Sequence, residues 1–301
     1  MSPWLVASLI LMVVLLLFSP IKTTFLSSAT PANLQVSALN SSPAPLPITQ
    51  GQPLPIISAK NVFITDMSSK TVLWQKDADA KVLPASTTKM MTALVVLEHF
   101  GLTDEITVTT AYPAGTVVGF KPGEKLTVEQ LLYALLVQSA NDAAEILAEN
   151  YPEGRTAFVA AMNAKASQIH LTNTHFVNPT GIDEEGHYSS ASDLARLADV
   201  ALRNAEFSKI VATENAVISS HVITNVNQLL GKIPGVIGIK TGYTEGAGQA
   251  LVTLVNRDNH PVILVVLGSV DRFGETATLI GWVYSNFRWE PLGPTPQTPS
   301  Q

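Results

Sequence analysis

Short runs of apolar and β-branched residues predict strands at both ends of the globular part of the chain. Five such runs occur, at residues 62–65, 72–74, 236–239, 250–255 and 262–267. The first two flank a turn at residues 67–70, and the last two flank a polar turn at residues 257–260. We therefore expect an antiparallel sheet of about five strands.

Apolar residues at helical spacing fill the middle of the chain and return at its end. Three such patterns are Met90, Ala93, Leu94 and Leu97; Leu131, Leu132, Leu135 and Leu136; and Ile280, Val283, Tyr284 and Phe287. Thr127 and Gln130 have the spacing of a capping box before the second pattern. The order of strands and helices predicts an α+β fold, with a helical subdomain inserted into the sheet.

The two ends of the chain differ in composition from the predicted α+β region. Residues 4–21 are all apolar, small or proline, which predicts a membrane anchor or a cleaved signal peptide over residues 1–22. Residues 23–58 carry no charge and many prolines, so we expect a tether there, and residues 290–301 predict a proline-rich tail. The remaining residues, 59–289, are expected to form the folded domain.

Composition removes several classes of function. The chain has 18 basic and 24 acidic residues in 301, a net charge of −6, and no cysteine. It therefore lacks the basic surface of a nucleic-acid-binding protein and can form neither a disulfide nor a thiolate nucleophile. Its 6 histidines show no closely spaced metal-binding pair. We expect no metal ion and no cofactor.

Ser86 and Lys89 are the first candidates for chemistry. They lie where the first helical pattern begins, three residues apart and so on one face. A serine needs a neighbour that accepts its proton, and a lysine can do so only where burial or another cation keeps it neutral. The spacing is not specific by itself, because Ser19 and Lys22 repeat it at the end of the apolar segment.

Two further motifs strengthen the interpretation. Ser139-Ala140-Asn141 follows the second helical pattern, and Lys240-Thr241-Gly242 ends a predicted strand. In this order the three motifs resemble the signature of penicillin-binding proteins and serine β-lactamases. Wider blocks resemble the low-molecular-mass D-alanyl-D-alanine carboxypeptidases, namely residues 84–98, 121–144, 176–181, 187–195 and 238–248.

The resemblance implies a role for each motif residue. Ser86 would be the acylated nucleophile and Lys89 its general base. Ser139 would relay a proton to the leaving group, while Asn141 would hold the substrate backbone and Lys89. Lys240 would help to keep Lys89 neutral.

The third motif would bind the substrate. Lys240 and Thr241 would hold the terminal carboxylate. Gly242 would leave the strand edge open, so that a peptide could lie against it. The backbone N–H groups of Ser86 and Tyr243 would form an oxyanion hole.

Two other residues in the matching blocks have simpler expected roles. We expect His187 to begin the helix that carries Leu194, and Asp142 to stabilise a loop.

By resemblance we expect a β-lactamase/transpeptidase-like fold with the active site between the sheet and the helical subdomain. The implied activity is trimming of the terminal D-alanine from peptidoglycan stem peptides, with β-lactams as covalent inhibitors. The protein would act outside the cytoplasm, anchored through its N-terminal segment or secreted after cleavage.

Three alternatives stay open, together with the oligomeric state. A DD-endopeptidase would use the same site. A serine β-lactamase of one large class would need an acid, which residues 172–181 lack. A catalytically silent binding protein would normally have lost Ser86 or Lys89.

Overall fold

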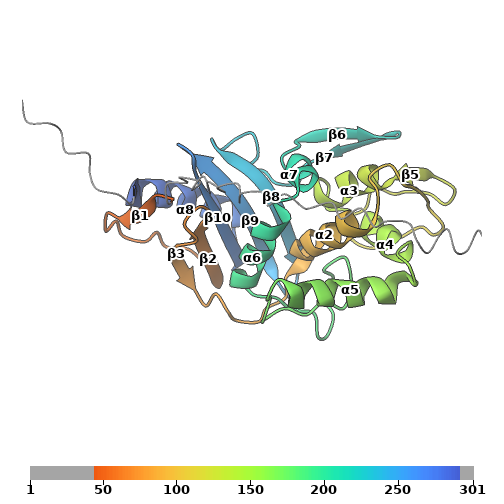
Figure 1. The fold of residues 1–301 in the computed structure, drawn as a ribbon, viewed down its shortest axis with the longest axis horizontal. Coiled ribbons are helices and arrows are strands. Elements are labelled where there is room, and N and C mark those ends of the chain that lie inside the picture. Colours follow the sequence, from red (N-terminus) through yellow and green to blue (C-terminus); the bar gives the residue numbers. More distant parts are fainter. Residues whose placement is uncertain (1–43, 292–301) are drawn as a thin grey trace, which may run out of the picture. The chain divides into compact units, whose positions relative to one another are not determined.

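A five-stranded antiparallel sheet forms the centre of the computed structural model, which describes residues 44–291 (Figure 1). The strand order is β3-β2-β10-β9-β8, so the hairpin near the start of the domain pairs with strands near its end. These strands are β2 Asn61–Asp66, β3 Val72–Lys76, β8 Val236–Thr244, β9 Gly248–Arg257 and β10 His260–Ser269. The predicted α+β fold and its five-stranded sheet are confirmed.

Most of the helices lie between β3 and β8 in the chain. They are η1 Ala85–Thr88, α2 Lys89–His99, α3 Val128–Leu136, α4 Asn141–Glu149, α5 Gly154–Gln168, α6 Ala191–Ala201 and α7 Ala205–Val211, with α8 Arg272–Asn286 following β10. Short strands pair in two further places, β4 Glu105–Thr107 with β5 Lys125–Thr127 and β6 Asn215–Ile218 with β7 His221–Thr224. The three helical patterns of the sequence correspond to α2, α3 and α8, except that Phe287 of the third pattern lies in β11, Phe287–Glu290.

Both faces of the sheet are buried. Successive side chains along each strand point to opposite faces, so each strand contributes to two apolar clusters. On β10, Val262 and Leu264 belong to the apolar cluster that contains α8 residues, whereas Ile263 and Val265 belong to the cluster that contains α6. Figure 1 shows α8 and α6 on opposite sides of the sheet. Full burial of each such side chain is worth about 1.5–3 kcal/mol, so β10 anchors both layers.

Local signals in the sequence predict the turn between β9 and β10 and the start of α3. Asp258 and Asn259 both have positive φ, 51° and 63°, in the two-residue turn between β9 and β10. Aspartate and asparagine tolerate this conformation better than most residues. Thr127 and Gln130 form the predicted capping box of α3.

The ordered domain extends further toward the N-terminus than residue 59, the boundary expected from composition. Strand β1, Leu46–Thr49, pairs with β11, Phe287–Glu290, within the segments expected as tether and as the edge of the tail. Further along, Glu275 accepts hydrogen bonds from the backbone of Ser58 and Ala59. The prolines near β1 are compatible with this strand, because an edge strand needs ladder hydrogen bonds on one side only.

Other predictions concern segments for which no placement is described. The proposed anchor or signal peptide at residues 1–22, most of the tether and residues 292–301 lie outside the described residues. Within residues 44–291, no helix combines the length and apolarity needed to cross a membrane.

The β1–β11 pairing predicts the effect of truncation. A chain that begins at Ala59 loses β1 and the hydrogen bonds of residues 50 and 52 to Asn286, whereas one that begins at Pro43 keeps them. We expect the shorter chain to be less stable by about 1–3 kcal/mol, which lowers the melting temperature by roughly 2–10 °C. Calorimetry of the two chains measures this difference, and equal melting temperatures would contradict it.

Candidate active site

Ser86 lies in η1, a single turn of 3-10 helix that leads directly into α2. The Thr87 hydroxyl donates to the Pro84 carbonyl at 2.6 Å and holds this turn closed. Lys89, the first residue of α2, is fully buried, whereas Ser86 is partly exposed. Lys89 Nζ lies 3.0 Å from Ser86 Oγ. The structure thus brings the hydroxyl and the amine into contact, as their spacing predicts.

Two other groups bind the Lys89 amine. Its Nζ donates to Asn141 Oδ1 and to the Thr180 carbonyl oxygen, both at 2.6 Å. These oxygens only accept hydrogen bonds, so they use two N–H bonds of the amine. When Lys89 is neutral, its lone pair is left for the third direction, toward the Ser86 hydroxyl. The arrangement orients the amine as an acceptor of the serine proton.

Burial also adjusts the protonation of Lys89. Desolvation lowers its pKa to about 7, against the opposing effect of the Glu145 and Asp142 carboxylates. A substantial fraction of the amine is therefore neutral near neutral pH. This is the condition under which a lysine can act as a general base.

Lys240 forms a second buried centre with Ser139. Its Nζ donates to Ser139 Oγ at 2.8 Å and to the Thr241 carbonyl oxygen at 2.9 Å. Burial, followed by the charges of Lys89 and Arg272, lowers the pKa of Lys240. Ser139 has a positive φ of 66°, an unfavourable conformation for a non-glycine residue and one that recurs at functional sites.

The loop at residues 114–116 fixes the orientation of Asn141. Its Nδ2 donates to the Ala114 carbonyl oxygen, and its backbone N–H donates to that of Thr116. Gly115 has a φ of 72°, and a Cβ atom there would lie 2.4 Å from Asn141 Nδ2. The glycine allows the loop to close over the amide, which leaves Oδ1 facing Lys89.

Gly242 brings β8 against the nucleophile. A Cβ atom at this position would lie 3.1 Å from Ala85 Cβ and 3.2 Å from the Ser86 backbone nitrogen. The missing side chain therefore permits close contact with η1, in addition to the open strand edge expected from the sequence. Arg272 Nη1 donates to the Gly242 carbonyl oxygen at 2.7 Å, and the Tyr243 side chain is 61% exposed.

His187 differs from its expected role, whereas Asp142 matches it. Helix α6 begins at Ala191 and is capped by Ser190, so His187 does not start it. The imidazole is buried, accepts from the Val177 N–H and lies 2.9 Å from Thr88 Oγ1. Burial lowers the pKa of His187 to about 4, so the ring is neutral. It joins the loop at Val177 to Thr88 in η1. Asp142 binds the backbone N–H groups of residues 118–120.

The predicted residues thus form two contacting groups, Ser86 with Lys89 and Asn141, and Lys240 with Ser139 and Thr241, while Gly242 packs on the nucleophile turn. Sequence reasoning missed Thr180 and Arg272. Thr180 acts through a backbone carbonyl that any residue could supply, so only its place in the block at 176–181 marked it. Arg272 is a single cation in the first turn of a helix and belongs to no motif.

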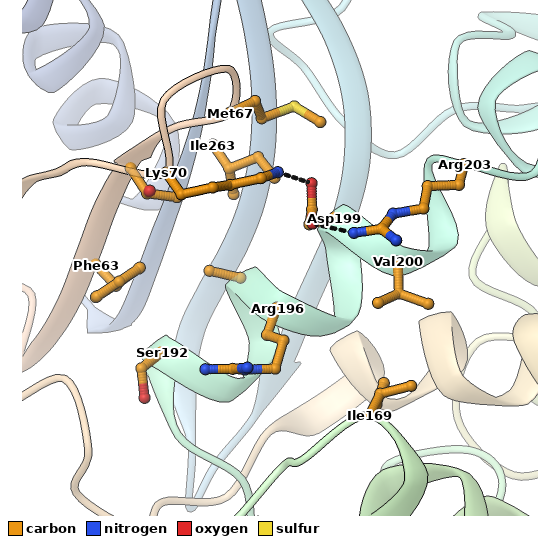
Figure 2. A pocket seen from close by; sticks show the side chains of 12 residues that line it. Phe63, Met67, Lys70, Ile169, Ser192, Arg196, Asp199, Val200, Arg203 and Ile263 are labelled. Carbon is orange, nitrogen blue, oxygen red and sulfur yellow. Dashed lines mark hydrogen bonds and ion pairs between the residues drawn. The ribbon is translucent and has the colours of Figure 1, made fainter. Parts of the chain in front are cut away.

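A cavity of about 440 Å³ lies away from these residues, between α6 and the β2–β3 hairpin (Figure 2). Lys70 and Arg203 both form ion pairs with Asp199 at its edge. None of the predicted site residues lines it. Among residues 44–291, no cluster of three or more histidine or acidic side chains is arranged to hold a metal ion.

A serine hydroxyl in contact with a buried lysine is an arrangement that can support nucleophilic catalysis through an acyl intermediate. The model of peptidase family S11, described as D-alanyl-D-alanine carboxypeptidase, matches residues 48–271. The chain therefore belongs to this family.

Individual relatives agree with the family assignment. The chain is 32% identical to D-alanyl-D-alanine carboxypeptidase DacF of Bacillus subtilis over 80% of this chain and 66% of DacF. It is 35% identical to DacB2 of Mycobacterium tuberculosis over 77% of this chain and 84% of DacB2. The crystal structure of a D-alanyl-D-alanine carboxypeptidase from Mycobacterium tuberculosis H37Rv has a TM-score of 0.76 at 32% identity, covering 82% and 99% of the two chains.

The packing of Gly181 on the nucleophile turn yields a prediction. Gly181 has a φ of 86°, and a Cβ atom there would lie 1.9 Å from the Ala85 carbonyl oxygen. Gly181→Ala combines backbone strain with overpacking, so we expect a loss of about 2–4 kcal/mol in the free energy of unfolding, measured by urea denaturation.

The matched control is Gly123→Ala, because Gly123 has a similar φ of 93° and open space around the new methyl group. We expect this variant to lose only about 1 kcal/mol. Equal losses in the two variants would show that backbone strain alone accounts for the effect.

Proposed function

We propose that this protein is a serine-type D-Ala-D-Ala carboxypeptidase, which releases the terminal D-alanine of peptidoglycan stem peptides through an acyl-enzyme on Ser86. The observation that carries the proposal is the buried Lys89 amine, 3.0 Å from Ser86 Oγ and held by two acceptor oxygens. Membership of the S11 family supports the same activity.

The reaction would begin with attack of Ser86 Oγ on the carbonyl carbon of the penultimate D-alanine. Lys89 takes the hydroxyl proton as the C–O bond forms. The C–N bond then breaks, and the terminal D-alanine leaves as an amine after receiving a proton relayed through Ser139. Water hydrolyses the resulting ester and restores the Ser86 hydroxyl.

Lys240 and Thr241 would bind the carboxylate of the departing D-alanine. Lys240 is buried and its pKa is lowered, so an incoming carboxylate would favour its charged form and pair with it. The substrate backbone would lie along β8 at Gly242. The N–H groups of Ser86 and Tyr243 would stabilise the oxyanion, a contribution of about 3–4 kcal/mol for each donor in well-studied hydrolases.

The location follows from the substrate. Members of a cell-wall enzyme family act outside the cytoplasm, where peptidoglycan lies. Residues 1–22 would serve as anchor or signal peptide, with a tether running from residue 23 to the domain. β-Lactams would acylate Ser86 and inhibit the enzyme.

Release of D-alanine from a D-Ala-D-Ala peptide is the direct test. We expect turnover by the full-length protein and a loss of at least about a thousandfold in Ser86→Ala, because no other group replaces the nucleophile. Intact mass after addition of benzylpenicillin would show a persistent adduct that Ser86→Ala lacks.

The alternatives give different results in the same assays. A DD-endopeptidase would cleave cross-linked dimers faster than the free pentapeptide. A β-lactamase would destroy penicillin rapidly without a lasting adduct. Absence of both turnover and adduct would indicate a silent binding protein.

The pKa of Lys89 predicts the pH profile of acylation. Because the base is active only when unprotonated, the second-order rate of penicillin adduct formation should rise about tenfold per pH unit below pH 7 and level off above it. Intact-mass measurements on samples quenched at set times, from pH 5 to 9, give this profile. A flat profile across pH 7 would contradict the role of Lys89 as base.

A further inference from the structure

The cavity of Figure 2 lies on the face of the sheet that α6 covers, away from the reacting centre. Its walls come from one side of α6, from β2 and the turn that follows it, from Ile263 on β10 and from Ile169 at the end of α5. Its volume of about 440 Å³ falls within the range of small-molecule sites. The chemistry of the lining shows which ligand it suits.

The floor of the cavity is apolar and only partly covered. Four side chains pack against the apolar cluster that contains α6 residues, yet each stays half-buried, namely those of Phe63, Met67, Ile169 and Val200. The fully buried Ile263 completes the floor. An apolar group that enters the cavity removes this surface from water, which favours binding.

Cations surround the floor. Figure 2 shows Lys70, Arg196 and Arg203 around a single carboxylate, that of Asp199. Asp199 pairs with Lys70 at 2.6 Å and with Arg203 at 3.0 Å. Three cations against one carboxylate leave an excess of two positive charges in the lining, although the whole chain carries a net charge of −6. The positive charge is therefore a local feature of this cavity.

Arg196 is the cation without a partner. It is exposed and forms no ion pair or hydrogen bond within residues 44–291. Ser192, Arg196 and Asp199 follow one another at intervals of four and three residues, so they share one side of α6. The guanidinium thus stands over the floor with its N–H donors unused.

One further acid stands at the edge of the cavity. The Ser192 hydroxyl donates to the Asp79 carboxylate, which itself does not line the cavity. With Asp79 included, the region keeps an excess of one positive charge. A ligand that carries a single negative charge balances it.

We propose that this cavity is a binding site for a small amphipathic carboxylate, a molecule with one carboxylate group on an aryl or alkyl body. The carboxylate binds the Arg196 guanidinium, whose planar fork of donors matches its two oxygens. The apolar body covers Phe63 and Met67 on the floor. The site is separate from Ser86 and Lys240, and the inference does not depend on the proposed function.

The test uses three ligands with the same apolar body, 4-phenylbutyrate, 4-phenylbutanol and 4-phenylbutylamine. Binding to the full-length protein is followed by ligand-observed NMR titration. We expect a Kd of about 1–5 mM for the carboxylate, as is typical of a molecule with about a dozen non-hydrogen atoms. The alcohol should bind about fivefold more weakly and the amine more weakly still, because an exposed ion pair contributes only modestly.

Methionine labelling locates the bound ligand. In protein labelled with ¹³C at the methionine methyl groups, the Met67 resonance should shift during the phenylbutyrate titration. Met90 and Met91 are fully buried in α2 and do not line the cavity, so their resonances should stay in place. This measurement also separates the cavity from Lys240, which is a second possible position for a carboxylate.

Variants assign the preference to Arg196. Arg196→Gln should bring the Kd of the carboxylate within about twofold of that of the alcohol. Arg288→Gln removes the same charge from an exposed position on β11 outside the cavity and should keep the preference. If Arg196→Gln does not fold, the unmodified protein still decides, because the preference must weaken as salt is raised to roughly 0.5 M.

Four results would overturn the inference. They are equal affinities for the carboxylate and the alcohol, a fixed Met67 resonance, a preference that survives in Arg196→Gln, and tighter binding of the dianion 4-phenylbutylphosphonate. Light scattering provides a fifth, because a dimer that phenylbutyrate dissociates would show that a second copy of the chain covers the cavity. Each of these results leaves the carboxypeptidase assignment standing.

Discussion

The burial of the Lys89 amine is the constraint on which the site depends. A charged amine without water is costly, so the surrounding structure must either supply acceptors or shift the group toward its neutral form. Here it does both. Asn141 supplies an oxygen from the start of α4 and Thr180 supplies one from the loop before Gly181, and desolvation lowers the pKa of Lys89 to about 7. This arrangement of Lys89 depends on the start of α4, the segment at Thr180 and η1 meeting at one point.

Close backbone approach makes that meeting possible. A Cβ atom would collide with the site at positions 115 and 181 and would pack tightly against it at position 242. Each glycine allows a different segment to touch either η1 or Asn141. His187 adds a neutral polar link between Thr88 and Val177 in the loop before Gly181. Contacts of this kind position reacting groups accurately.

The electrostatics of the site are incomplete without a substrate. Lys89 and Lys240 are both buried, and neither forms an ion pair within the described residues. Burial, and then the charges of Lys89 and Arg272, lower the pKa of Lys240. An anionic substrate end at Lys240 would give this part of the site its electrostatic complement.

The sequence by itself determined the elements whose signals are local. The apolar and β-branched runs of the five strands, the residues of the β9–β10 turn and the capping box of α3 each depend on neighbours within a few positions. The three motifs likewise identified the residues now found around Ser86 and Lys240. Only the tertiary structure decided that Thr180 binds a lysine 91 positions away, that β1 pairs with β11, and that Gly242 packs on η1. Those contacts join segments distant in the chain through backbone atoms, which any residue type carries, so no residue pattern announces them.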